Sequence, residues 1–251
     1  MSTKCLRIFA GPNGSGKSSL YKFLISQNYF HKYYFINADE IAKGLANGYS
    51  FTNWPIDISE NDYLEFLKKS SFNDVIDIEY VKKYLSFKDS VFTWNGEINN
   101  LTYISASIAD YLRTKFLNSY SSFSFETVFS HPSKLDFIKQ AKEKGFKIYL
   151  YFISTRSPTI NENRVENRAL TGGHSVPLEK INSRYYKCLD NLYDAIKLCD
   201  KVFLFDNSES KNELTYNNFA EIVNGECCVT AGTVPEWFIK YVYNKTLSNI
   251  T

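Results

Sequence analysis

Short apolar runs recur along the chain, and each is long enough to form one strand. They are rich in β-branched, aromatic and leucine residues and cover residues 6–10, 33–37, 122–126, 147–154 and 201–206. The runs are nearly continuous, whereas a strand with one wet face alternates apolar and polar positions. This pattern predicts a parallel sheet that is buried on both faces. Helical stretches lie between the runs, so the predicted fold class is α/β.

Two helices are predicted between the fourth and fifth runs. Ser157 and Pro158 mark the start of the first helix, because serine caps a helix and proline fits its first turn. Gly172 and Gly173 mark its end. The second helix opens at Pro177, and its apolar residues recur at helical spacing: Ile181, Tyr185, Leu189, Leu192 and Ile196.

The spacing of the runs predicts a single domain, residues 1–251, with additions. Residues 102–117 predict a crossover helix before the third strand. About residues 48–98 mix turn residues with aromatics and acids without one clean period, which indicates an inserted subdomain. The later additions are a lid at about 156–186 and a C-terminal extension at about 209–251 that holds a strand and a helix.

The composition fits an ordinary globular protein. The chain has 251 residues, of which 44% are hydrophobic and 22% are charged, with a formal net charge of +2. These values exclude disorder and a polyanion-coating role. The five cysteines form no CxxC pair, so neither a disulfide framework nor a Cys/His zinc site is expected. The first segment lacks the features of a signal peptide or a membrane span, and a cytoplasmic location is expected.

The segment after the first run carries the strongest motif. Its letters GPNGSGKS match the phosphate-loop pattern G-x-x-x-x-G-K-[ST], between a predicted strand and a predicted helix. Backbone N–H groups of such a loop surround phosphate oxygens, the lysine reaches the β- and γ-phosphates, and the serine ligates Mg²⁺. ATP or GTP and Mg²⁺ are therefore the expected ligands. The residues expected to bind them are Gly11, Pro12, Asn13, Gly14, Ser15, Gly16, Lys17, Ser18 and Ser19, with Ser18 on the metal.

The rest of the chain lacks the marks of switch GTPases and ABC-type ATPases. No Asn-Lys-x-Asp element follows the fourth strand, and a signature loop before a hydrophobic strand ending in Asp-Glu is also missing. Phosphoryl transfer to a hydroxyl group is the better hypothesis. Asp39 lies at the carboxyl end of the second predicted strand, where a carboxylate can accept the hydroxyl proton. The alternative role of Asp39 is to cap the helix that follows.

Three further charged residues are candidates for the same chemistry. Glu126 ends the third strand, where it can orient the acceptor, hold a Mg²⁺-bound water or pair with Lys17. Arg164 and Arg168 are four residues apart, so they share one helical face. They can neutralise charge on the transferring phosphoryl group, or they can pair with nearby glutamates on a solvated helix.

Seven ordered segments together resemble the zeta-toxin family of phosphate-loop kinases. They are the phosphate loop at 10–18, NADE at 37–40, FET at 125–127, RVENR at 164–168, GGHSVP at 172–177, INSRY at 181–185 and DNS at 206–208. The resemblance implies a mononucleotide-kinase-like core with strand order 2-3-1-4-5. It also implies an ATP-dependent kinase, and the better-known members phosphorylate the 3′-hydroxyl of UDP-N-acetylglucosamine.

The resemblance assigns roles to individual residues. Lys17 corresponds to the phosphate lysine, Asp39 to the general base, and Arg164 with Arg168 or Arg184 to the charge-neutralising arginines. The remaining roles are acceptor binding by Glu126, Thr127 and Arg184, and a place near the adenine for Asp206 and Asn207. A nucleotide sugar or another small anionic acceptor and a small antitoxin protein are the implied partners, whereas a nucleic-acid partner is not expected.

Two departures from the family pattern concern the acceptor. No arginine or lysine follows Glu126 closely, because the run continues as TVFSH, and the insertion lies beside the acceptor pocket. Another acceptor, such as a nucleotide or a nucleic-acid end, is therefore the alternative within the same chemistry. An ATP-dependent switch is the alternative from another class. For His174 we predict a lid-hinge role and not a catalytic one.

Overall fold

The computed structural model describes residues 3–30, 34–97, 101–119, 121–170, 176–209, 216–230 and 232–247. The chain divides into two compact units. The first unit comprises Met1–Tyr33 and Ser124–Thr251, and the second comprises Tyr34–Phe123. The expected division into a kinase domain with an insertion, a lid and an extension stays a prediction.

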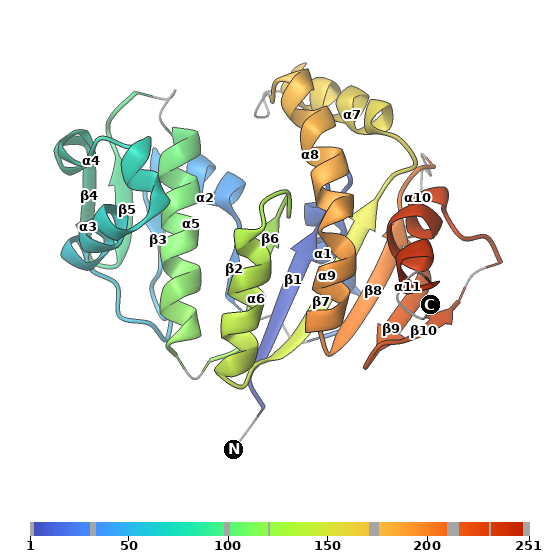
Figure 1. The fold of residues 1–251 in the computed structure, drawn as a ribbon. Helices are drawn as coiled ribbons and strands as arrows, with labels where there is room; N and C mark the ends of the chain where they lie inside the picture. The colour runs from blue at the N-terminus through green and yellow to red at the C-terminus, as the bar shows by residue number, and fades with distance from the viewer. Residues whose placement is uncertain are drawn as a thin grey trace. The chain divides into compact units, whose positions relative to one another are not determined.

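The first unit is built on a mostly parallel sheet (Figure 1). Its strands are β1 (Cys5–Ala10), β6 (Phe123–Thr127), β7 (Lys147–Ser154), β8 (Lys201–Asp206), β9 (Asn217–Val223) and β10 (Glu226–Val229), in the order β10-β9-β8-β7-β1-β6. Strands β1, β7 and β8 pair in parallel, whereas β9 and β10 add as antiparallel strands. The third, first, fourth and fifth predicted strands are β6, β1, β7 and β8. They lie side by side in the order 3-1-4-5 that the resemblance implies.

Helices cover both faces of this sheet. Phe9 packs edge-on against Tyr21 of α1, and on the other face Phe152 packs against Trp237 of α10, with ring centroids 5.1 and 5.8 Å apart. The α/β class is confirmed. The helices and helical turns of this unit are α1 (Lys17–Ser26), α6 (Ser133–Glu143), α7 (Pro158–Leu170), α8 (Leu178–Asp190), α9 (Leu192–Leu198), α10 (Glu236–Phe238), the π-helical η3 (Ile239–Tyr243) and α11 (Asn244–Leu247).

The helix predicted to run from Pro177 past Leu192 divides in two. Asn191 ends α8 and precedes α9, and its side-chain Nδ2 donates 3.0 Å to the backbone oxygen of Phe129. The apolar spacing continues across the break, so the spacing alone predicts a single helix. Within the described residues this asparagine holds the loop that follows β6.

The second unit contains its own small sheet and several helices (Figure 1). Its elements are β2 (Tyr34–Ile36), α2 (Ala38–Leu45), β3 (Tyr49–Ser50), α3 (Glu60–Lys69), the 3₁₀ turn η1 (Ser71–Asp74), α4 (Ile78–Tyr84), β4 (Leu85–Lys88), β5 (Val91–Trp94) and α5 (Leu101–Leu117). The antiparallel sheet has the order β3-β5-β4. Asn37, Ser59 and Asp77 cap α2, α3 and α4 with their side chains.

Aromatic side chains form the core of the second unit. The fully buried Tyr63 packs against Phe92 and Tyr111, with ring centroids 5.7 and 5.5 Å apart. Phe51 also contacts Phe92, and its centroid distance is 5.4 Å. The Tyr63 hydroxyl is paired with the hydroxyl of Ser107 at 2.7 Å, which satisfies both polar groups. The aromatic residues of the predicted insertion therefore have a structural use.

Candidate functional site

The phosphate-loop residues form a tight turn between β1 and α1. Gly14 and Gly16 have φ values of 74° and 101°, a region that favours glycine. A Cβ on Gly14 would lie 2.6 Å from the backbone oxygen of Asn161, and one on Gly16 would lie 2.6 Å from Nδ2 of Asn207. Positions 14 and 16 therefore require glycine for two reasons. Their φ values are positive, and neighbouring atoms leave no room for a Cβ.

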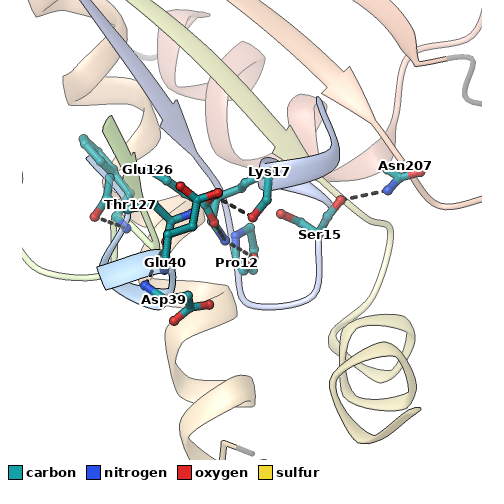
Figure 2. A network of polar contacts seen from close by, with 11 residues as sticks. Pro12, Ser15, Lys17, Asp39, Glu40, Glu126, Thr127 and Asn207 are labelled. Carbon is teal, nitrogen blue, oxygen red and sulfur yellow. Dashed lines mark hydrogen bonds and ion pairs between the residues drawn. The ribbon is translucent and has the colours of Figure 1, made fainter. Parts of the chain in front are cut away.

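Lys17 is the first residue of α1, and its side chain is buried. Its Nζ donates a 2.9 Å hydrogen bond to the backbone oxygen of Pro12, within the same loop (Figure 2). Oε1 of Glu126, at the end of β6, lies 3.9 Å from Nζ. The lysine is thus folded back over the loop, and its ammonium group faces one carboxylate.

Ser18 and Glu126 form the second link between the loop and β6. The Ser18 hydroxyl donates 2.7 Å to Oε2 of Glu126, whose side chain is 13% exposed. Of the three roles predicted for Glu126, the pairing with Lys17 is present, and the same carboxylate also accepts the Ser18 hydroxyl. Serine and carboxylate oxygens are hard ligands of the kind that Mg²⁺ prefers. These two residues therefore fit a magnesium ion that also takes phosphate oxygens.

Ser15 supports the phosphate assignment independently. Its side chain is fully buried, and its hydroxyl has no hydrogen-bond partner among the described residues. A buried polar group without a partner costs about 1–3 kcal/mol. A phosphate oxygen in the loop would satisfy this hydroxyl. Within the described ranges no group of three His, Cys, Asp or Glu residues is placed to hold a metal by itself.

Asn207 ties three elements together. Its Nδ2 donates 2.8 Å to the backbone oxygen of Ser15 (Figure 2). Its backbone N–H donates 2.8 Å to the backbone oxygen of Ser154 at the end of β7. Its own backbone oxygen accepts a 2.8 Å hydrogen bond from Nη1 of Arg164. Burial lowers the pKa of the Arg164 guanidinium. Both residues were predicted for the nucleotide site, and the structure places them together beside the loop.

Asp206 faces other parts of the fold. Its Oδ1 accepts the backbone N–H of Ser208 at 2.9 Å, and its Oδ2 accepts the indole N–H of Trp237 at 2.8 Å. Both carboxylate oxygens are therefore used in a turn and in holding α10. The sequence offered no sign of the second contact, because Trp237 lies 31 residues away.

Tyr216 was missed by the sequence analysis. It precedes β9, and its ring centroid lies 5.2 Å from that of Phe23 on α1. Burial raises the pKa of its hydroxyl, and the neighbouring Ser19 hydroxyl and Arg164 guanidinium oppose that shift. A single tyrosine in a polar segment carries no pattern, so only the fold brings it to the phosphate loop.

The other predicted residues lie on α7, on α8 and at the end of β6. Arg168 is exposed on α7, Arg184 is half-buried on α8, and the Thr127 hydroxyl accepts the backbone N–H of Phe129 at 3.4 Å. Residues 172–175, which include His174, lie outside the described residues.

Asp39 belongs to the second unit, where it is exposed in the first turn of α2. The cap of that helix is Asn37, whose Oδ1 accepts the backbone N–H groups of Asp39 and Glu40 at 2.8 and 3.4 Å. The capping role that was the alternative for Asp39 is therefore taken by its neighbour.

No protein-family model and no curated protein sequence matches the chain. Solved structures with the same fold include the AvrRxo1-ORF1:AvrRxo1-ORF2 complex with sulphate ions, at a TM-score of 0.58 and 15% identity over 95% of this chain. The AvrRxo1-ORF1:-ORF2 complex with ATP gives a TM-score of 0.57 and 16% identity over 91% of this chain. The chain spans 63% and 61% of the lengths of those two matched chains.

A third structure, from the PezAT chromosomal toxin-antitoxin system of the human pathogen Streptococcus pneumoniae, has a TM-score of 0.49 and 13% identity over all of this chain and 85% of its own. The first two likenesses and the observed sheet agree on the fold. The chain therefore shares the fold of the chains matched in the two AvrRxo1 complexes, with the phosphate-loop residues between β1 and α1. Within the described ranges, no helix combines the length and the apolar character needed to cross a membrane.

Proposed function

We propose that the protein is an ATP-dependent phosphotransferase that moves the γ-phosphate of ATP to a hydroxyl group of a small anionic acceptor. The observation that carries the proposal is the contact of Glu126 with both Ser18 and Lys17 of the phosphate loop, at 2.7 and 3.9 Å. A carboxylate at this place serves phosphoryl transfer, because it sits where the γ-phosphate and its metal are expected.

Each residue of the loop has a role in this proposal. The backbone N–H groups of Gly11 and of residues 13–16 and the buried Ser15 hydroxyl bind phosphate oxygens. Lys17 exchanges the Pro12 oxygen for the β- and γ-phosphates. Ser18 and Glu126 hold Mg²⁺, which, when bound, neutralises charge on the phosphate oxygens. Because the Lys17 ammonium is buried, its interaction with the phosphates is weakly screened.

The acceptor hydroxyl loses its proton to Asp39 in this proposal. Asp39 is an exposed carboxylate in the first turn of α2, and Asn37 already caps that helix. Arg164, Arg168 and Arg184 are the proposed charge-neutralising groups on the helices of the lid region. Arg184, Glu126 and Thr127 are also the proposed acceptor contacts.

The proposed acceptor is a UDP-activated amino sugar such as UDP-N-acetylglucosamine. The zeta-toxin resemblance of the motifs supports this choice, and the arginines of α7 and α8 suit a diphosphate acceptor. A small antitoxin protein is the proposed partner. The AvrRxo1 structures, which pair two proteins, support a partner of this kind.

The test is a transfer assay with γ-labelled ATP and Mg²⁺ against nucleotide sugars, nucleotides and RNA. The expected result is labelled nucleotide sugar, lost in Lys17→Ala and kept in Lys22→Ala, an exposed lysine of the same helix. Label on a nucleotide or on an RNA end would contradict the proposed acceptor but would still support kinase activity. Release of free phosphate alone, with no labelled acceptor, would favour an ATP-dependent switch and overturn the proposal.

A further inference from the structure

The segment before β9 brings an aromatic ring to the first two turns of α1. The Tyr216 and Phe23 ring centroids lie 5.2 Å apart, and the planes are tilted by 52°. Ser19 and Phe23 are four residues apart, so they share one face of α1, and the Tyr216 hydroxyl lies beside Ser19. Tyr216 therefore lies over the side of α1 that carries Ser19.

Arg164 borders the same place with a fixed side chain. Its Nη1 is held by the backbone oxygen of Asn207 at 2.8 Å, and Asn207 is held in turn to Ser15 of the phosphate loop. The Tyr216 hydroxyl and the Arg164 guanidinium are close enough to influence each other, since Arg164 opposes the burial-induced rise in the pKa of Tyr216. Arg164 therefore lies at the edge of the place that Tyr216 and Ser19 form.

The start of α1 indicates where the γ-phosphate and the nucleoside of a bound nucleotide would each lie. Ser18 points to Glu126, where the metal and the γ-phosphate are proposed to lie. Ser19 is the next residue of the helix and is rotated by about 100° from Ser18. The nucleoside is therefore expected to leave the phosphate loop on a side other than that of Glu126, and Ser19 and Tyr216 mark such a side.

We infer that Tyr216 and Phe23 form a stacking wall for the base of the bound nucleotide. This inference rests on the proposed function, because it needs a nucleoside triphosphate in the loop. The wall is built in part by the segment beyond Asp206, which the sequence analysis treated as an extension. Stacking accepts every base, because each base has a π-face, so the wall supplies affinity more than base selectivity.

Tyr216→Ala tests the wall by comparing two probes, ATP and inorganic tripolyphosphate. Calorimetry or competition with a fluorescent nucleotide would measure both affinities at one magnesium concentration. Removing a stacking aromatic weakens base binding by about tenfold or more. We expect that loss for ATP and none for tripolyphosphate, which has no base. Tyr216→Phe keeps the ring and should keep ATP affinity, and Tyr29→Ala removes an exposed tyrosine as a matched control.

The outcomes separate this inference from the proposed function. Equal losses for both probes, or unchanged ATP affinity in a folded Tyr216→Ala protein, would overturn the wall and leave the kinase proposal intact. Failure of the unmodified protein to bind either probe would overturn the proposed function itself. If Tyr216→Ala does not fold, photolabelling of the unmodified protein with 8-azido-ATP replaces it. Label on the peptide that contains Tyr216 or on α1 supports the wall, and label confined to other segments overturns it.

Discussion

The Ser18 hydroxyl donates a 2.7 Å hydrogen bond to Oε2 of Glu126. The two residues are 108 positions apart in the chain, and each stands at the end of a structural element, Ser18 in the first turn of α1 and Glu126 in β6. The bond fixes the carboxylate beside the phosphate loop, where Lys17 adds a charge interaction at 3.9 Å. Removing the charge of Glu126 while keeping its shape is therefore the most direct probe of the proposed reaction.

Glu126→Gln is expected to lower kcat for phosphoryl transfer by about 10²–10³-fold, because the metal and the acceptor lose a carboxylate placed for the transition state. ATP affinity should change far less, since the phosphate loop and Lys17 remain. A steady-state transfer assay with parallel ATP titration measures both quantities. The matched control is Glu143→Gln, an exposed glutamate at the end of α6. Transfer at the unmodified rate in Glu126→Gln would remove Glu126 from the mechanism.

Gly14 and Gly145 offer a matched pair of glycines. Their φ values are 74° and 78°, so alanine suffers similar backbone strain at both positions, about 1–2 kcal/mol. A Cβ at Gly14 meets the Asn161 oxygen at 2.6 Å, whereas a Cβ at Gly145 meets nothing within 4 Å. Gly14→Ala should therefore lower the free energy of unfolding by about 1–3 kcal/mol more than Gly145→Ala does, as measured by urea unfolding. Gly14→Ala should also abolish ATP binding. Equal stabilities would show that the loop relaxes around the methyl group.

The sequence predicts the part of the fold whose signals are local. The continuous apolar runs of β7 and β8 match the predicted ranges residue for residue, because strands buried on both faces leave no polar gaps. The phosphate loop is also local, and its glycines and lysine are where the motif requires. Strand β9 escaped prediction, because NNFAEIV opens on two asparagines and shows neither a continuous apolar run nor strict alternation.

The missing parts of the site depend on contacts between distant residues. Tyr216 reaches Phe23, and Trp237 reaches Asp206, across separations that no helical or strand period encodes. The internal structure of residues 48–98 was equally hidden, because its core is made of aromatic pairs such as Tyr63 and Phe92. Periodicity reports which face of an element is buried, but not which other element covers it.

The cluster around Asp62 in the second unit predicts a dependence of stability on pH. A hydrogen bond from Lys115, at 2.5 Å, and one from Tyr111, at 3.0 Å, hold the pKa of Asp62 below its ordinary value. A lowered folded-state pKa stabilises the fold above the unfolded pKa of about 3.9, and the contribution is lost as the pH falls through the folded value.

Asp62→Asn should therefore destabilise the protein at pH 7 by less than about 1 kcal/mol, because the half-exposed carboxylate is screened by solvent. The difference should shrink below about pH 4, where the unmodified carboxylate becomes protonated. Urea unfolding at several pH values measures it, and Asp74→Asn provides an exposed aspartate of the same unit as control. A difference that stays constant down to pH 2 would contradict the assignment.

The cysteines should divide by reactivity. Burial raises the pKa of the Cys188 thiol, although the nearby Lys17 lowers it in part, and burial raises the pKa of Cys199. Only a thiolate attacks an alkylating reagent, so both thiols should resist iodoacetamide in the folded protein. Cys227 and Cys228 are exposed and should be labelled first, as peptide mass spectrometry would show. Labelling of Cys188 at the rate of Cys228 would mean that α8 is not packed as described.

Trp237 makes two kinds of contact, a hydrogen bond to Asp206 and ring packing, and substitutions at this position can measure them separately. The indole donates 2.8 Å to the carboxylate, while the ring packs against Phe152 and Phe219 with centroid distances of 5.8 and 5.4 Å. Trp237→Phe keeps a ring and loses the donor, for an expected cost of about 1.5–3 kcal/mol, because the accepting group is charged. Trp237→Ala also loses the packing and should cost about 3–5 kcal/mol.

A double-mutant cycle with Asp206→Asn isolates the bond itself, measured by urea unfolding. The two residues are in contact, so their effects should fall short of additivity by about 0.5–3 kcal/mol. Ser208 still donates its backbone N–H to the asparagine at position 206, which keeps the turn and limits the cost of the control. Additive effects would mean that the indole and the carboxylate stabilise the fold independently. In that case the end of β8 would be held by the turn at Ser208 and by the packing of the Trp237 ring. The hydrogen bond between Trp237 and Asp206 would then add nothing to the free energy of unfolding.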